Sequence, residues 1–136
     1  FSATPLNIKL GQLLPSSMTA TTLSWTHTGA SATINQSIGA IAVSGTRSVS
    51  PTTTTTYTLT ATNTDGSTPQ SVTVTVVKAD DVDGSGTVTI QDYAALVTDF
   101  GKTGTFSGDI DGNGKVDIFD YNIFVTNYAG QVSLSQ

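Results

Sequence analysis

Residues 81–92 read DVDGSGTVTIQD and residues 109–120 read DIDGNGKVDIFD, and these two stretches decide the fold of the second half of this 136-residue chain. They lie 28 residues apart. When residues 81–102 are aligned with the chain 28 positions further on, ten of the 22 pairs are identical. Agreement on this scale indicates an internal duplication, so we expect two structural units of one kind.

Both stretches match a twelve-residue loop that surrounds a calcium ion. Such a loop supplies side-chain oxygens from positions 1, 3, 5 and 12 and a backbone carbonyl from position 7, and glycine at position 6 permits a sharp turn. Both stretches satisfy each of these requirements. A solvated turn rich in aspartate and glycine is the alternative for either stretch alone, but two in register predict two bound Ca²⁺ ions.

The distribution of charge divides the chain. Aspartate is the only acidic residue, and nine of the ten aspartates follow Lys78. Residues 79–136 carry nine aspartates against two lysines, a net charge of −7, whereas residues 1–78 carry a net charge of +2. Carboxylates at this density repel one another in a compact fold unless cations neutralise them. The imbalance favours two small domains, residues 1–78 and 79–136, and a metal rather than a nucleic acid as ligand.

Composition also indicates where the protein works. The chain contains no cysteine, so it holds neither a disulfide framework nor thiolate chemistry. No apolar run approaches the roughly 18 residues that a membrane span needs. A chain rich in threonine and serine, without glutamate and poor in lysine, is typical of extracellular bacterial modules. We therefore expect a secreted or cell-surface location, and a mature portion of a longer protein.

Residues 5–78 alternate apolar and polar residues in short runs. Glycine, proline, asparagine and aspartate separate the runs, as they do between the strands of all-β domains. About seven half-buried strands at this spacing predict a β-sandwich. The runs are Leu6/Ile8/Leu10, Leu23/Trp25, Ala32/Ile34, Ile41/Val43, Val49, Tyr57/Leu59/Ala61 and Val72/Val74/Val76.

Residues 45–63 and 71–76, dominated by threonine, serine and valine, resemble the bacterial Ig-like repeats strung along secreted enzymes and surface proteins. The resemblance implies an Ig-like sandwich over residues 1–78. Trp25 invites a sugar-stacking role, but it lies on the alternating apolar face of its strand, which favours a place in the core. His27 has no nearby arrangement of residues that would activate a nucleophile, so we expect no catalytic residue in this half.

After each loop the spacing of apolar residues changes to that of a helix. Apolar residues at i, i+3, i+4 and i+7 predict two amphipathic helices of about ten residues, whose aromatic stripes pack against one another. Gly101 and Gly130 are expected to end these helices. Neither loop is preceded by a stretch suited to a helix, so each unit is a loop followed by a helix. The stripes are Tyr93, Leu96, Val97 and Phe100, and Tyr121, Phe124, Val125 and Tyr128.

Tandem loop-helix repeats over residues 80–130 resemble the dockerin family, small modules that bind cohesin modules and assemble extracellular polysaccharide-degrading complexes. The resemblance implies an α-helical calcium-binding module of two F-hand repeats over residues 79–136. Position 9 of the loops, Thr89 or Asp117, would reach the ion through water. Because a hydroxyl is a poorer calcium donor than an amide or carboxylate, Ser85 at position 5 makes site one the weaker site. The implied ligands are Asp81, Asp83, Ser85, Thr87 (carbonyl) and Asp92, and Asp109, Asp111, Asn113, Lys115 (carbonyl) and Asp120.

In dockerins the cohesin-facing residues lie at loop positions 10 and 11 and on the helix that follows. In the second repeat Phe119, Ile123 and Asn127 lie opposite the aromatic stripe, and an apolar pair on that face is typical of an interface anchor. We expect the second repeat to carry most of the binding, in a single orientation; alternatively, Phe119 and Ile123 cover the Ig-like half. The other implied contact residues are Ile90, Gln91, Val97 and Thr98, and Ile118, Val125 and Thr126.

Together these features favour a non-catalytic docking module that binds a cohesin and tethers a larger extracellular protein to a scaffold. The rival is a calcium-rigidified structural terminal module without a cohesin partner. A calcium sensor is disfavoured because sensors use paired helix-loop-helix units that open a groove. An enzyme is least favoured because the carboxylates are committed to metal, and we expect no small-molecule substrate.

Overall fold

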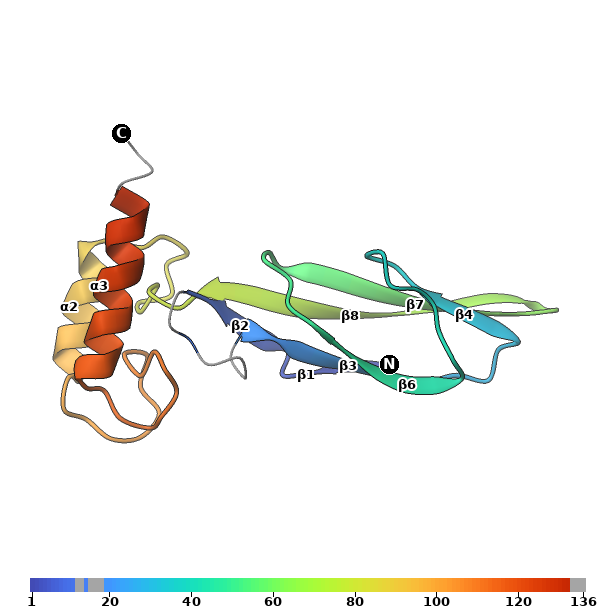
Figure 1. The fold of residues 1–136 in the computed structure, drawn as a ribbon, viewed down its shortest axis with the longest axis horizontal. Helices are drawn as coiled ribbons and strands as arrows, with labels where there is room; N and C mark the ends of the chain where they lie inside the picture. The colour runs from blue at the N-terminus through green and yellow to red at the C-terminus, as the bar shows by residue number, and fades with distance from the viewer. Residues whose placement is uncertain (12–13, 15–18, 133–136) are drawn as a thin grey trace. The chain divides into compact units, whose positions relative to one another are not determined.

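The computed structural model describes residues 1–11, 14 and 19–132 (Figure 1). The chain divides into two compact units, which we call the first and the second unit. The first comprises Phe1–Ile8 and Ala20–Val76, and the second comprises Lys9–Thr19 and Val77–Gln136. The division at Val77 lies close to the predicted boundary, but the segment Lys9–Thr19 belongs with the second unit. Among the described residues, no helix combines the length and apolar character needed to cross a membrane.

The described residues form eight strands (Figure 1). These are β1 (Ser2–Thr4), β2 (Asn7–Leu10), β3 (Thr21–Thr26), β4 (Ser31–Ile34), β5 (Gly39–Ala40), β6 (Ser44–Val49), β7 (Thr55–Asn63) and β8 (Gly66–Lys78). One sheet has the order β1–β3–β6 and the other the order β2–β8–β7–β4–β5. The pairs β1–β3, β3–β6, β4–β5, β4–β7 and β7–β8 are antiparallel.

One hydrophobic core of the first unit takes side chains from both sheets, which is the arrangement of a β-sandwich. Alternate residues of each strand point to the same face, so the apolar runs of the sequence point inward together. Trp25 is partly buried against this core, as predicted, and its indole nitrogen donates to the carbonyl of Ala42 at 3.0 Å. The buried members of the core are Ala3, Ile8, Leu23, Ala32, Ile34, Tyr57, Leu59 and Val74.

Three details of the strands differ from the prediction. The Ile41/Val43 run forms no strand of its own, because residues 41–43 connect β5 to β6 and Val43 is exposed. The first strand, β1, is missed because it has only three residues and a single buried apolar side chain, Ala3. β8 also extends well before the valine run, since Gly66 to Gln70 continue the pairing with β7.

The helices described in the second unit are α2 (Ile90–Asp99) and α3 (Ile118–Val132), and each begins at position 10 of one of the repeated loops (Figure 1). α2 ends before Gly101, which has a φ of 83°, as predicted for a terminating glycine. The predicted end of the second helix at Gly130 is wrong, because α3 continues to Val132. An interior glycine costs a helix only about 1 kcal/mol relative to alanine, so it does not force an end.

Aromatic rings of α2 and α3 pack against one another, as predicted. The ring centroid of Tyr93 on α2 lies 6.4 Å from that of Tyr121 and 6.1 Å from that of Phe124, both on α3. Other members of the predicted stripes differ in burial, since Leu96 is fully buried whereas Val97, Phe100 and Val125 are exposed. The buried core of this unit comes partly from the loops and consists of Ala79, Val82, Leu96, Ile110, Val116, Ile123 and Phe124.

Candidate metal centre

The structure gathers the aspartates of each loop into one cluster. Asp81, Asp83 and Asp92 each offer a carboxylate oxygen, and these atoms all lie within 4.8 Å of one another. The second loop repeats this arrangement, under the same distance limit, with Asp109, Asp111 and Asp120. Three carboxylates at this separation repel one another unless a cation lies among them. Oxygen-only ligands at positions 1, 3 and 12 suit a hard cation such as Ca²⁺.

The position-1 aspartates each hold one oxygen in place and leave the other without a partner. Oδ2 of Asp81 accepts a hydrogen bond from the backbone N–H of Gly86 at 2.9 Å, and Oδ2 of Asp109 accepts one from Gly114 at 2.9 Å. Oδ1 of both residues is buried and has no hydrogen-bond partner. A buried carboxylate oxygen without a partner is costly. Its occurrence at the same position of both loops fits a metal ligand.

The position-12 aspartates connect the loops to the helices. Asp92 is fully buried and accepts hydrogen bonds from the backbone N–H groups of Asp83 at 3.0 Å and Thr89 at 2.6 Å. Asp120 is equally buried and accepts from Asp111 at 3.1 Å and Asp117 at 2.8 Å. Each carboxylate therefore links, through hydrogen bonds, the backbone N–H groups at positions 3 and 9 of its loop.

These contacts also set the ionisation of Asp92. Burial raises the pKa of Asp92, but the hydrogen bonds from the backbone N–H groups of Asp83 and Thr89 outweigh it, and the pKa lies below its usual range. The carboxylate is therefore held in the ionised form that a metal ligand needs.

Positions 3 and 5 differ between the two loops. In the first loop the Ser85 hydroxyl donates to the carbonyl of Thr87 at 3.0 Å, so the groups at positions 5 and 7 contact each other. In the second loop the Asn113 side-chain amide donates to Oδ2 of Asp111 at 2.9 Å. Burial raises the pKa of Asp111, and the negative charges of Asp120 and Asp109 raise it further. The hydrogen bonds from Asn113 lower it but do not offset this rise. The backbone of Lys115, the residue at position 7 of the second loop, forms an isolated antiparallel β-bridge with Thr103.

Glycines at positions 4 and 6 give both loops the same backbone path. Gly84 and Gly112 have φ values of 73° and 74°, and Gly86 and Gly114 have values of 87° and 86°. This left-handed region is strained for residues with a Cβ atom, which explains the need for glycine at both positions. The agreement between the loops shows that the sequence duplication is also a duplication of backbone geometry.

The residues at position 9 have a second role that the sequence analysis did not identify. Thr89 is the N-cap of α2, where its hydroxyl accepts from the N–H of Gln91 at 3.2 Å and forms a capping box with Asp92. Asp117 accepts from the N–H of Phe119 at 2.9 Å in the second repeat. The S/T-x-x-acid pattern of a capping box is the signal that could have indicated this role at Thr89.

Lys9 is a further residue of this centre that sequence reasoning missed. Its Nζ donates to the backbone carbonyls of Asp109 at 3.3 Å and Ile110 at 3.2 Å, within the second unit. Burial lowers the pKa of Lys9, although the charges of Asp109, Asp120 and Asp111 act to raise it. No local pattern predicts this contact, because 100 residues separate Lys9 from Asp109.

The residues predicted to contact a partner separate into exposed and buried ones. Phe119 is 62% exposed, whereas Ile123 is only 4% exposed and belongs to the core of the second unit. Asn127 is buried as well, so the expectation that these three residues form one exposed stripe is wrong. Ile123 lies on α3 and shares one hydrophobic core with Val82, Ile110 and Val116 of the loops. The other predicted contact residues, Ile90, Gln91, Val97, Thr98, Ile118, Val125 and Thr126, are exposed.

A comparison of the chain with protein-family models, with curated proteins and with solved structures returns no match. The interpretation of the two loops therefore depends on their own geometry. That geometry consists of three clustered carboxylates, one unpartnered buried oxygen and one backbone path in each loop.

Proposed function

We propose that the second unit binds two Ca²⁺ ions and that the ions order it into a surface for another protein. The observation that carries this proposal is the unpartnered, buried Oδ1 of Asp81, repeated at Asp109. A cation at each cluster would give that oxygen a partner and relieve the repulsion among the three carboxylates. Asp83 and Asp92 complete the first site with Ser85, and Asp111, Asp120 and Asn113 complete the second.

The partner that we propose is a cohesin module of an extracellular scaffold. On this proposal the second unit is a dockerin-like, non-catalytic tether, and the first unit is an Ig-like spacer next to a larger secreted, polysaccharide-degrading protein. Support comes from the loop-helix order of both repeats and from the exposed apolar residues that follow the loops. Ile90 and Ile118 are exposed at position 10 of their loops, although side chains of this type are usually buried.

We further propose that the second repeat dominates this contact. The two repeats differ at the exposed position 11 of the loop, which is Phe119 in the second repeat and Gln91 in the first. A largely exposed phenylalanine buries more apolar area on binding than a glutamine does. Because Ile123 and Asn127 are buried, they are no longer part of the proposed surface, and Phe119 is its anchor.

The experiment is a calorimetric titration of the whole chain against a panel of cohesins, with calcium and with excess chelator. We expect binding to at least one cohesin in calcium and none in chelator. Phe119→Ala should weaken that binding by about 2 kcal/mol, as expected for an interface anchor, and Gln91→Ala should have little effect. Equal losses for the two variants would contradict the dominance of the second repeat, and failure with every cohesin would contradict the partner.

The structural alternative remains the second candidate, because one observation favours it. The carboxylates of Asp92 and Asp120 join each loop to the start of its helix, which stiffens the unit whether or not a partner binds. A structural module would keep its calcium-dependent stability and bind no cohesin. The titration above therefore separates the two candidates, provided that calcium binding is measured on the same sample.

A further inference from the structure

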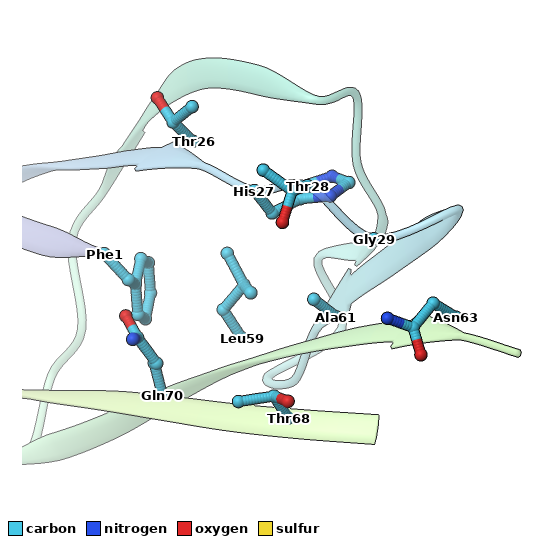
Figure 2. Close-up of a pocket in the computed structure, with 10 residues that line it drawn as sticks. All are labelled: Phe1, Thr26, His27, Thr28, Gly29, Leu59, Ala61, Asn63, Thr68 and Gln70. Carbon is cyan, nitrogen blue, oxygen red and sulfur yellow. The ribbon is translucent and has the colours of Figure 1, made fainter. Parts of the chain in front are cut away.

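A pocket in the first unit is unrelated to the calcium loops. It lies between the two sheets, has a volume of about 290 Å³, and is lined only by residues of the first unit (Figure 2). Pockets that bind small ligands have volumes of about 300–1,000 Å³, so this one suits a ligand of about one ring. Its lining includes Phe1, His27, Leu59, Asn63, Thr68 and Gln70.

His27 is buried in this pocket without the hydrogen bonds that its ring requires. Its side chain is 8% exposed, and neither Nδ1 nor Nε2 has a hydrogen-bond partner. A neutral imidazole offers one donor and one acceptor, and burial of both without partners is costly. The ring lines the pocket (Figure 2), but both nitrogens are shielded from solvent, so a ligand there supplies hydrogen-bond partners only after the imidazole rotates about its side-chain bonds.

The inward faces of the strands change from apolar to polar at this end of the sandwich. Along β8 the inward positions run from Val74 and Val72 to Gln70 and Thr68, and in the β7–β8 register Gln70 lies opposite the buried Leu59. Figure 2 shows the side chains of Gln70 and Thr68 on one side of the pocket and His27 on the other. Gln70 and Thr68 are both exposed, so these inward positions lie at the open end of the sandwich, where their polar groups can contact a ligand from solvent.

The inward face of β7 also changes from apolar to polar residues towards the end of the strand. The buried Leu59 on its inward face is followed two residues on by the small Ala61 and then by Asn63. Oδ1 of Asn63 accepts from the N–H of Asp65 at 2.9 Å, which leaves its amide group able to donate into the pocket. Three strands or strand ends therefore place donors and acceptors around one small space.

The chemistry of the lining identifies the class of ligand. No lining residue of the pocket is an aspartate, glutamate, lysine or arginine. An ionised ligand would lose its hydration here without gaining a counter-charge, so a neutral ligand is favoured. Imidazole, amide and hydroxyl groups both donate and accept, which matches the hydroxyl groups of a sugar. The ring of Phe1 and the side chain of Leu59 provide the apolar contact that one face of a sugar ring needs.

We propose that this pocket binds a single neutral sugar unit, with His27 and Gln70 as its main hydrogen-bonding residues. The site is separate from the calcium centre and requires no cohesin partner. A neutral amide, such as a peptide group, is the competing class of ligand, and the experiment includes it.

The experiment uses the fact that His27 is the only histidine in the chain, so its imidazole nitrogen signals in an NMR spectrum need no assignment. The nitrogen-15-labelled chain is titrated, in calcium, with neutral monosaccharides and their methyl glycosides, and separately with N-methylacetamide. We expect saturable shifts of the His27 nitrogens with at least one sugar, with a Kd on the order of 1 mM, as suits a small ligand. N-methylacetamide should give no saturation.

Gln70→Val tests the contact itself, because it extends the valine pattern of the inward face of β8. We expect it to weaken sugar binding by about tenfold, the effect of one lost hydrogen bond. Ser71→Val is the matched control, since it changes the neighbouring residue of the same strand on the opposite face. If Gln70→Val fails to fold, Thr68→Val replaces it. The proposal is overturned if no sugar saturates the shifts, if only the amide does, or if Gln70→Val binds as tightly as the control.

Discussion

Removal of calcium should unfold the second unit and leave the first unit intact. Each loop holds three carboxylate oxygens within 4.8 Å of one another. Two unit charges at this distance repel by about 1 kcal/mol in water and by about 3–4 kcal/mol at an effective dielectric constant of about 20. Asp83 is exposed but the other five carboxylates are partly or fully buried, so the value in water is a lower limit, which gives at least about 3 kcal/mol for the three pairs of one loop.

Both loops together therefore destabilise the ion-free second unit by at least about 6 kcal/mol, which is comparable with the whole stability of a small domain, about 5–15 kcal/mol. The hydrophobic core of this unit is small, with seven buried apolar residues among those described, and has little reserve. Calcium binding thus supplies much of the folding free energy.

Two optical signals separate the units in this experiment. Trp25 is the only tryptophan of the chain and lies in the first unit, so its fluorescence reports on the sandwich. The far-UV circular dichroism of α2 and α3 reports on the second unit. Excess chelator should abolish the helical signal and leave the fluorescence unchanged, and added calcium should restore the helices. Asp81→Asn combined with Asp109→Asn should behave as the chelated protein does. Helices that persist in excess chelator would refute the reasoning.

Three further substitutions test particular residues. Ser85→Asn gives the first loop the position-5 side chain of the second loop. Calorimetric titration with calcium should then show that the weaker of the two sites binds about 1 kcal/mol, or roughly fivefold, more tightly. An unchanged weaker site would contradict the prediction that the first loop forms the weaker site. Gly86→Ala adds a Cβ atom at a φ of 87°, and should destabilise the calcium-bound second unit by about 1–2 kcal/mol in urea titrations followed by circular dichroism. Leu96→Ala removes a fully buried core side chain, and the same titration should show a loss of about 2–5 kcal/mol.

The acidic clusters could be predicted from the sequence because their geometry is local. Asp81, Asp83 and Asp92 lie within twelve residues, and glycines at fixed positions bend the chain between them. The glycine that ends α2 could be predicted in the same way, whereas α2 begins earlier than expected, at Ile90 inside the loop. A β-sandwich could likewise be predicted, because alternation along each strand records which side chains point inward.

Contacts between distant parts of the chain were not predictable in this way. The helical pattern allowed either face of α3 to be the buried one, and the loop residues Val82, Ile110 and Val116 decide that Ile123 is buried. Lys9 reaches the second loop across a separation that no sequence pattern spans. The polar residues on the inward faces of β7 and β8 were visible in the alternation, but their meeting around His27 depends on the pairing of the sheets.

The chain passes from one unit to the other three times, after Ile8, after Thr19 and after Val76. The second unit is thus assembled from two separate pieces of polypeptide. In the shorter piece, the Nζ of Lys9 donates to the carbonyl of Asp109, and the carbonyl of Leu10 accepts from the N–H of Ala79 at 2.8 Å. A protease nick between Val76 and Val77 would leave two fragments that stay associated without a covalent link. Expression of residues 79–136 alone would omit the shorter piece, which could then be added back as a synthetic peptide to complement the fragment.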